Sequence, residues 1–156
     1  MATAERTWTV SPIGSVSSPR GEATDNEWGT IRASITLLPP FDGSSLRGLE
    51  EFSHVEVIYL FDRVDPSSVC LHARRPRGNP SWPEIGIAQR AKDRPNRLGL
   101  STCELLGVED RTIHVRGLDA VDGTPVLDVK PYLQEFAPRG SIRQAAWSTE
   151  LMANYF

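Results

Sequence analysis

The sequence predicts a mainly β protein, a single-domain antiparallel barrel or sandwich with one or two short helices. Roughly seven short segments with strand patterns follow one another at close spacing, and only the C-terminal segment has the pattern of a longer helix. Twelve glycines and twelve prolines among 156 residues exceed the ~12% of an ordinary domain and are typical of many turns. A chain of this length holds one hydrophobic core, so we expect one domain over residues 1–156.

The clearest strand signal is strict alternation of apolar and polar side chains at residues 30–38. Ile31, Ala33, Ile35 and Leu37 alternate there with polar residues. A period of two indicates a strand with one buried face. Two consecutive prolines end it, because proline cannot donate to a β-ladder.

A second strong segment, residues 53–61, becomes apolar on both faces and so predicts a central strand. Between the two strong strands, Leu46, Leu49 and Phe52 allow at most one or two helical turns. Weaker strand patterns occur at residues 7–16, 84–89, 99–108, 112–118 and 126–129.

The C-terminal tail, at about residues 141–156, is predicted to be helical. Ser141 and Gln144 have the spacing of a capping box. One face of the tail carries a stripe at positions i, i+4 and i+8: Trp147, Leu151 and Tyr155.

Composition and charge exclude several classes of protein. No apolar run is long enough to span a membrane, and the N-terminus lacks a signal-peptide pattern, so we expect a soluble, cytoplasmic protein with no membrane partner. Two cysteines exclude a disulfide framework and a four-cysteine zinc site, and the three histidines have no metal-ligand spacing, so no metal is expected. The net charge of −3 argues against a general nucleic-acid-binding protein, although residues 72–97 carry a local excess of basic side chains. Two explanations remain open for the preference for arginine over lysine, recognition of phosphate or carboxylate and a GC-rich genome, but the second does not explain this clustering.

Two segments are unusually rich in residues suited to chemistry, and the common catalytic signatures are missing. Residues 86–101 read GIAQRAKDRPNRLGLS, and residues 117–132 read GLDAVDGTPVLDVKPY. The first presents several arginines beside Pro95, and the second contains an Asp-Gly turn between short apolar runs. On spacing alone, both also fit ordinary polar connections between strands.

Together with SPIGSVSSP at residues 11–19 and the strand around residues 52–61, these segments resemble the TsaA-like (YaeB/TrmO) family. The family pattern contains RxxxRPNPIGLS followed by LDxxDGTPVLDIKPY. The resemblance runs in order over about residues 10–132. It implies a β-barrel methyltransferase that binds S-adenosylmethionine, forms a homodimer and methylates N6 of the modified adenosine at position 37 of tRNA.

The resemblance also implies site residues, matched motif by motif. The cofactor site would draw on Glu27, Trp28, Asp62, Arg63, Arg90, Leu100, Gly117, Leu118 and Asp119. Within the same motifs, residue type and not the resemblance leads us to expect substrate binding by Arg94 and Asn96, and catalysis by Asp122, Asp128, Lys130 and Tyr132.

Residue chemistry suggests roles within that set. We expect Asp119 to face the cationic end of the cofactor and Arg90 to bind its carboxylate, with Trp28 and Leu100 as apolar walls. Asp122 or Asp128 would accept a hydrogen bond from the substrate amine. Tyr132 would orient the base, and Lys130 or Arg94 would meet a phosphate or carboxylate.

The sequence departs from the family pattern at four places. Asp62 stands where many members have histidine, Gln89 where serine or threonine is usual, and Arg97 where the motif has proline. The sequence ends at Phe156, without the C-terminal domain of longer tRNA-modifying members, so we expect a short form. Two alternatives therefore remain: a non-catalytic S-adenosylmethionine-binding or regulatory module, and a purely structural or interaction barrel.

Overall fold

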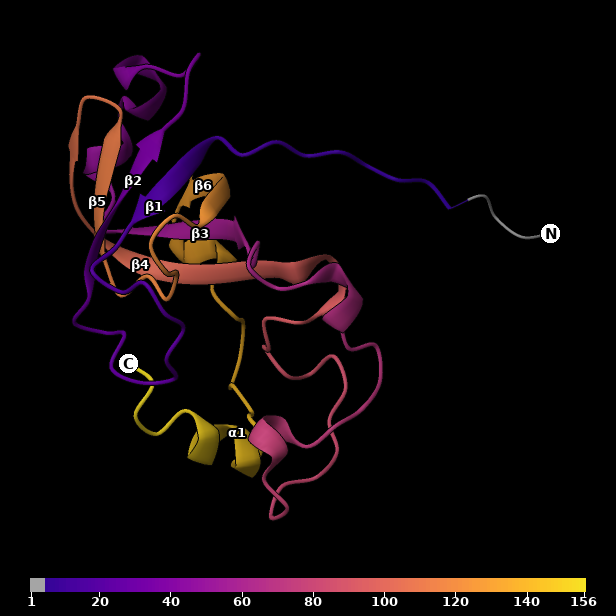
Figure 1. Cartoon of the computed structure of the whole chain (residues 1–156). Helices are drawn as coiled ribbons and strands as arrows, with labels where there is room; N and C mark the ends of the chain where they lie inside the picture. Colours follow the sequence, from indigo (N-terminus) through magenta and orange to yellow (C-terminus); the bar gives the residue numbers. More distant parts are fainter. Residues whose placement is uncertain (1–4) are drawn as a thin grey trace.

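The alternating segments of the sequence form the strands of a closed antiparallel barrel, which confirms the predicted fold class (Figure 1). The computed structural model describes residues 5–156. The six strands are β1 (Gly14–Ser17), β2 (Arg32–Leu37), β3 (His54–Leu60), β4 (Leu98–Glu109), β5 (Thr112–Arg116) and β6 (Pro125–Pro131). Their order around the barrel is β1-β2-β5-β4-β3-β6, and pairing of β6 with β1 closes it.

The inward-facing residues of each strand fill the barrel. In β3, Val55, Val57 and Tyr59 are almost fully buried, while the residues between them are partly exposed. Ile35 of β2 and Ile113 of β5 are also fully buried. Because side chains alternate across a strand, this period-two burial is the packing that the sequence pattern predicts.

Three weaker predictions differ from the structure. The predicted strand at residues 7–16 is shorter and lies later in the chain: β1 spans Gly14–Ser17 and pairs with β2 and β6. The predicted strand at residues 84–89 is wrong: this segment makes one isolated bridge, between Arg74 and Ile85, and the side chain of Ile87 is 74% exposed.

The C-terminal helix is also shorter than predicted. α1 spans Ala146–Leu151 and begins after Ala145, which makes no side-chain cap, so the capping box predicted for Ser141 and Gln144 does not form. The rest of the tail has no regular structure up to the helix and forms turns after it. Tyr155 consequently lies outside the helix and is free to make a tertiary contact.

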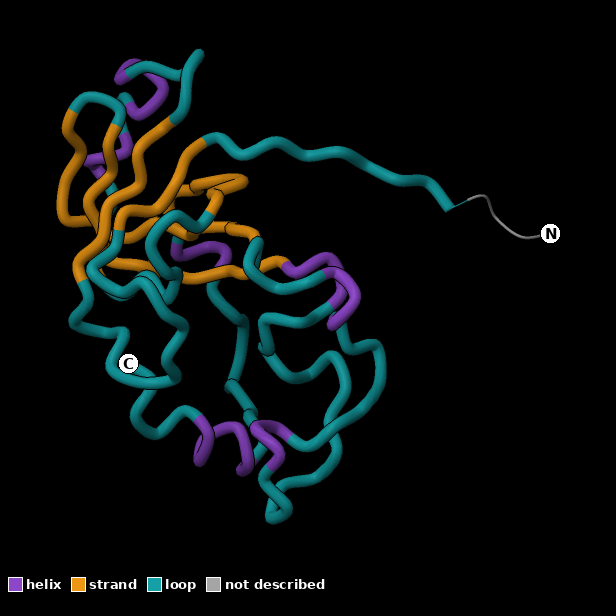
Figure 2. The backbone as a smooth tube through the Cα atoms, viewed as in Figure 1, coloured by secondary structure: helices purple, strands orange, loops and turns teal. Residues whose placement is uncertain are grey.

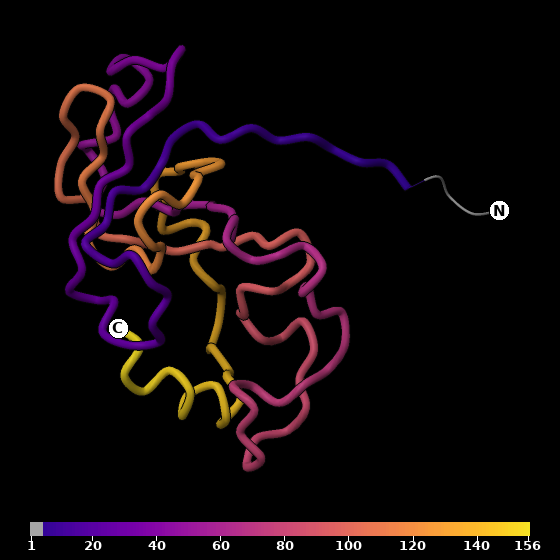
Figure 3. The backbone as a smooth tube through the Cα atoms, in the orientation of Figure 1, coloured from indigo at the N-terminus to yellow at the C-terminus, as the bar shows by residue number. Residues whose placement is uncertain are grey.

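A long loop-rich segment joins β3 to β4 at one end of the barrel and contains three short 3-10 helices: Pro66–Ser68, Pro76–Gly78 and Pro95–Arg97 (Figure 2). The other 3-10 helices are Gly43–Leu46, Leu49–Glu51 and Gln134–Phe136. α1 lies against this segment, where the Trp82 indole donates to the Glu150 carboxylate at 2.8 Å. The chain then returns to the barrel (Figure 3). Among residues 5–156, no helix is long and apolar enough to cross a membrane.

At position 99 of β4, the ring of Tyr59 on the neighbouring strand leaves no room for a side chain larger than that of glycine. A Cβ atom at position 99 would lie 2.5 Å from the Tyr59 Cζ atom, whereas one at Gly107, on the same strand, would have no heavy atom within 4 Å. We expect Gly99→Ala to lower the free energy of unfolding by about 1–3 kcal/mol, because the buried ring must shift. Gly107→Ala, the control, should change it by about 0.5 kcal/mol or less in urea unfolding. Equal stability of the two variants would contradict this packing.

Candidate functional site

The Asp119 carboxylate is the centre of a network of hydroxyl groups at the end of the barrel. The Tyr59 hydroxyl of β3 donates to Oδ1 of Asp119 at 3.0 Å, and the Ser101 hydroxyl of β4 donates to the same oxygen. The Tyr155 hydroxyl donates to Oδ2 at 2.6 Å. The hydroxyls of Tyr59 and Ser101 lie 3.2 Å apart. Four residues that are distant in sequence thus form one network around a single negative charge.

The donors of this network stay protonated. Burial, followed by the negative charge of Asp119, raises the pKa of the Tyr59 and Tyr155 phenols well above the usual value. Burial is also the main reason that the pKa of the nearby Cys103 thiol is raised to about 12. The network therefore holds one carboxylate among neutral groups, an arrangement suited to a cationic ligand.

The loop that carries Glu27 and Trp28 packs beside this network and is tied to the C-terminal segment. The backbone N–H of Glu27 donates to the carbonyl of Asn154, and that of Trp28 to the carbonyl of Tyr155, both at 2.8 Å. The Trp28 ring is only 2% exposed, and the Arg20 guanidinium lies 4.6 Å from its centre.

The chain leading into Asp119 is anchored to the same loop region. Gly117 has a φ of +86°, a conformation that favours glycine, and its N–H donates to the carbonyl of Ile31 at 3.0 Å. Leu118 is fully buried. The structure thus brings the loop of Glu27 and Trp28 close to the segment Gly117–Asp119, although the two segments are distant in sequence.

Arg63 and Asp122 form a second group next to the first. Arg63 donates to the carbonyl of Asp122 at 2.8 Å and to that of Gly21. The Asp122 N–H donates to the carbonyl of Arg20, whose guanidinium stacks on Trp28. Arg20 therefore links the two groups. Asp62 is exposed next to Arg63.

Arg90 and Leu100, two predicted cofactor-binding residues ten positions apart in the first motif, are in contact. The Arg90 guanidinium donates to the backbone carbonyl of Leu100 at 2.6 Å. The Leu100 side chain is 45% exposed, whereas that of Ser101 is 7% exposed and faces the barrel interior. Consecutive residues of a strand point to opposite faces, so Leu100 and the Asp119 network lie on opposite faces of β4.

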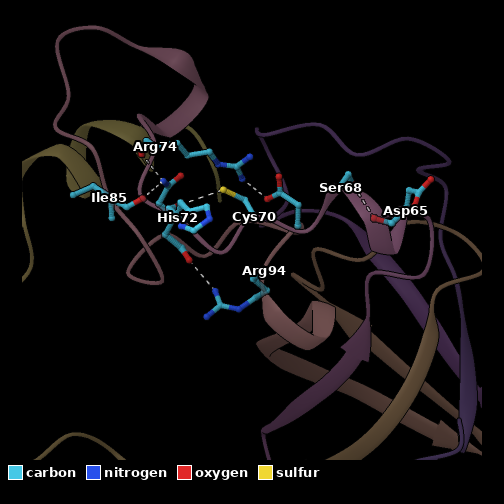
Figure 4. A network of polar contacts seen from close by, with 9 residues as sticks. Asp65, Ser68, Cys70, His72, Arg74, Ile85 and Arg94 are labelled. Atoms are coloured by element: carbon cyan, nitrogen blue, oxygen red, sulfur yellow. Dashed lines mark hydrogen bonds and ion pairs between the residues drawn. The ribbon is translucent and has the colours of Figure 1, made fainter.

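Several arginine side chains of residues 72–97 contact groups of the segment between β3 and β4 itself, both backbone carbonyls and a carboxylate (Figure 4). Arg94 donates to the carbonyl of Gln89 and Arg97 to that of Val64, each at 2.8 Å. Arg74 pairs with Asp93, and this hydrogen bond lowers the pKa of Asp93. Such contacts replace regular secondary structure in the segment, so the basic cluster has a structural role that its sequence did not reveal. Asn96 is exposed there, with a left-handed φ of 60°.

The remaining predicted residues lie on or beside β6. The Lys130 ammonium and the Asp128 carboxylate form an ion pair of 2.7 Å, and both side chains are about half exposed. Tyr132 follows β6 and donates its N–H to the carbonyl of His54 at 3.0 Å. None of the contacts described for these three residues reaches Asp119. Within residues 5–156, no cluster of three or more His, Cys, Asp or Glu side chains suits a metal ion.

Sequence reasoning missed Tyr59, Ser101 and Tyr155 as partners of Asp119. Tyr59 has the period of a buried strand face, and Tyr155 has the period of a helix face, so both patterns indicated packing alone. Ser101 closes the first motif and was the one signal available.

Comparison with known proteins places these motifs in a family. The sequence model of the family described as the tRNA-methyltransferase O N-terminal domain matches residues 18–137 of this chain. The crystal structure of TrmO from Pseudomonas aeruginosa superposes with a TM-score of 0.72 and 33% identity, over 90% of this chain and 63% of that chain.

Individual relatives differ in length. RcsF of P. aeruginosa is 44% identical over 106 residues, 65% of this chain and 45% of the relative. The human tRNA (adenine(37)-N6)-methyltransferase is 39% identical over 92 residues, 59% of this chain and 21% of that protein. A Methanothermobacter thermautotrophicus protein named "Probable S-adenosyl-L-methionine-binding protein" is 33% identical over 135 residues, 84% of this chain and 94% of the relative. The chain thus spans less than half of RcsF and of the human enzyme.

Proposed function

Because the chain belongs to the family of the tRNA-methyltransferase O N-terminal domain, we propose that it is an S-adenosylmethionine-dependent methyltransferase acting on N6 of an adenine. The substrate would be tRNA or a related adenosine-containing molecule. The observation that carries this proposal is the Asp119 carboxylate, held in the family motif by three neutral hydroxyl donors.

The residues proposed for the cofactor site fit the cofactor chemically, although Arg90 and Leu100 lie on the other face of β4 from Asp119. S-adenosylmethionine supplies an electrophilic methyl group on a sulfonium, together with an ammonium group, a carboxylate and an adenine. Asp119 provides a negative charge for the cationic end, and the Arg90 guanidinium retains donors for a carboxylate. Leu100, 45% exposed beside Arg90, offers an apolar surface. Glu27, Asp62, Arg63 and the loop at Gly117–Leu118 complete the proposed cofactor-binding set together with Trp28. The Trp28 ring is 2% exposed, so it would support the site from within the core and would not be the apolar wall expected from the sequence.

The substrate amine needs a group that accepts its hydrogen bond while the methyl group is transferred, because its lone pair is delocalised into the ring. Asp122 is the candidate we favour. Its main chain is tied through Arg20 and Arg63 to the region of Trp28 and Asp119, and its carboxylate oxygen Oδ1 accepts a hydrogen bond from the Ser18 N–H at 3.0 Å. Asp128 is instead paired with Lys130. Tyr132, Lys130, Arg94 and Asn96 remain in the proposal as groups that contact the substrate.

A homodimer belongs to the same proposal. On the outer face of the barrel, Ile58 pairs with Leu100 and Leu60 with Leu98, which makes a contiguous apolar patch of four side chains. Leu98 is 42% exposed. An exposed apolar patch next to a proposed ligand site is suited to contact with a second copy. We also place the protein in the cytoplasm, because its two cysteines are free and intracellular thiols stay reduced.

The first test is a calorimetric titration with S-adenosylmethionine, with ATP as the control for general adenine binding. We expect selective binding with one cofactor per chain. Methyl transfer is then measured to a tRNA pool and to small adenosine compounds. A folded protein that binds neither ligand would contradict the proposal.

A second candidate function is cofactor binding without turnover. It is favoured by the ion pair of Asp128 and Lys130, which engages two proposed catalytic residues with each other. It is also favoured by the nearly full-length match to an archaeal protein named for binding alone. Cofactor binding with no methyl transfer to tRNA or small adenosine compounds would support this candidate.

A further inference from the structure

The segment after α1 delivers a side chain to the proposed cofactor site. Residues 152–156 leave the helix and return to the barrel, as the yellow end of the trace in Figure 3 shows. Two backbone hydrogen bonds, from Glu27 to Asn154 and from Trp28 to Tyr155, hold this segment against the loop. Gly29 leaves room for it, because a Cβ atom there would lie 2.9 Å from the Phe156 carbonyl carbon. The position of Tyr155 is therefore set by main-chain contacts on both sides.

The three hydroxyl donors divide unequally between the two oxygens of Asp119. Tyr59 and Ser101, both on barrel strands, donate to Oδ1. Among the described residues, Tyr155 alone donates a side-chain hydrogen bond to Oδ2, at 2.6 Å. A carboxylate has about four acceptor positions, so one position on Oδ2 is left for a ligand. The direction of that free position depends on the Tyr155 hydroxyl.

We propose that Tyr155 is a positioning residue for cofactor binding, whose hydroxyl orients the free acceptor position of Asp119 toward the cationic end of S-adenosylmethionine. This inference rests on the proposed function. The two donors on Oδ1 fix the plane of the carboxylate, and the Tyr155 hydroxyl occupies one of the two acceptor positions of Oδ2, so it decides which of these positions remains for a ligand. The Tyr155 ring also packs edge-on against Phe156, with centroids 4.9 Å apart, so removal of the hydroxyl leaves the packing in place.

The test is Tyr155→Phe, which removes one hydroxyl and keeps the ring. Affinity is measured by calorimetry for S-adenosylmethionine and for 5′-methylthioadenosine, which keeps the adenosine and the sulfur but lacks the positive charges. We expect S-adenosylmethionine to bind about tenfold more weakly, as for loss of a hydrogen bond to a charged group, and 5′-methylthioadenosine to change by less than about twofold. Ser148→Ala, which removes a hydroxyl of α1 that donates to the Ala145 carbonyl, is the matched control and should bind both ligands as the unaltered protein does.

Ser101→Ala gives a second, independent measurement, because it removes a donor from the other oxygen of Asp119 and should also weaken S-adenosylmethionine selectively. Equal weakening of both ligands by Tyr155→Phe would overturn the proposal, since Tyr155 would then be a wall of the site. Unchanged or tighter binding of S-adenosylmethionine would also overturn it, and tighter binding would mean that the segment competes with the cofactor. If the unaltered protein does not bind S-adenosylmethionine, the proposed function fails together with this inference.

Discussion

Asp119→Asn should reduce the affinity for S-adenosylmethionine on the order of 100-fold. The substitution keeps the size of the side chain but removes the negative charge that we assign to the cationic end of the cofactor. It also replaces one acceptor oxygen with an amide N–H₂ group. This donor would face hydroxyls that themselves donate to Asp119 in the native protein. We therefore expect a second effect, a loss of about 1–3 kcal/mol in the free energy of unfolding. Calorimetry measures the first effect and urea unfolding the second.

Substitutions of two further carboxylates test whether the loss of affinity is specific to Asp119. Glu109→Gln, at the exposed end of β4, is the control for loss of one charge and should leave both quantities unchanged. Asp122→Asn should spare cofactor binding and slow methyl transfer, because Asp122 is the proposed acceptor of the hydrogen bond from the substrate amine. A folded Asp119→Asn protein with normal affinity would remove Asp119 from the cofactor site.

Leu98→Asp should convert the proposed dimer into a monomer. The new carboxylate would lie beside Leu60 in the apolar patch, where association would bury it without a partner. Sedimentation equilibrium measures the mass directly. Because the folded barrel leaves position 98 partly exposed to solvent, we expect the monomer to remain folded.

Leu106→Asp is the matched control for this substitution. Leu106 lies on the same strand and is similarly exposed, at 37%, but is separated from the patch by several residues. Its aspartate variant should stay dimeric. Loss of the dimer in both variants would indicate a general loss of solubility, and a dimer that survives Leu98→Asp would place the interface on another face.

The two strongest strand predictions succeeded because a half-buried strand imposes its own period on the sequence. Residues 30–38 and 53–61 were predicted, and the strands run over Arg32–Leu37 and His54–Leu60. The segment at residues 84–89 failed because an apolar residue such as Ile87 stays exposed when no strand partner is available. There, arginine contacts with backbone carbonyls organise the chain, and those contacts leave no periodic signal.

The choice between a barrel and a sandwich came from the family resemblance, because both folds produce the same alternation. The deciding contact is the pairing of Gly14 and Ser15 of β1 with Val126 and Pro125 of β6. Only two residue pairs make this contact, too few to mark the sequence. Closure is therefore a property of the whole set of strand registers.

By itself, the sequence determined which faces of the main strands are buried and which motifs match the family, since both are local patterns of residue type. The tertiary structure alone decided which hydroxyls meet Asp119. Tyr59, Ser101 and Tyr155 lie 60, 18 and 36 residues from it along the chain. Strand register placed the first two, and the early end of α1 released the third from its helical stripe. Contacts over such separations depend on how the chain closes on itself, and no local pattern encodes that closure.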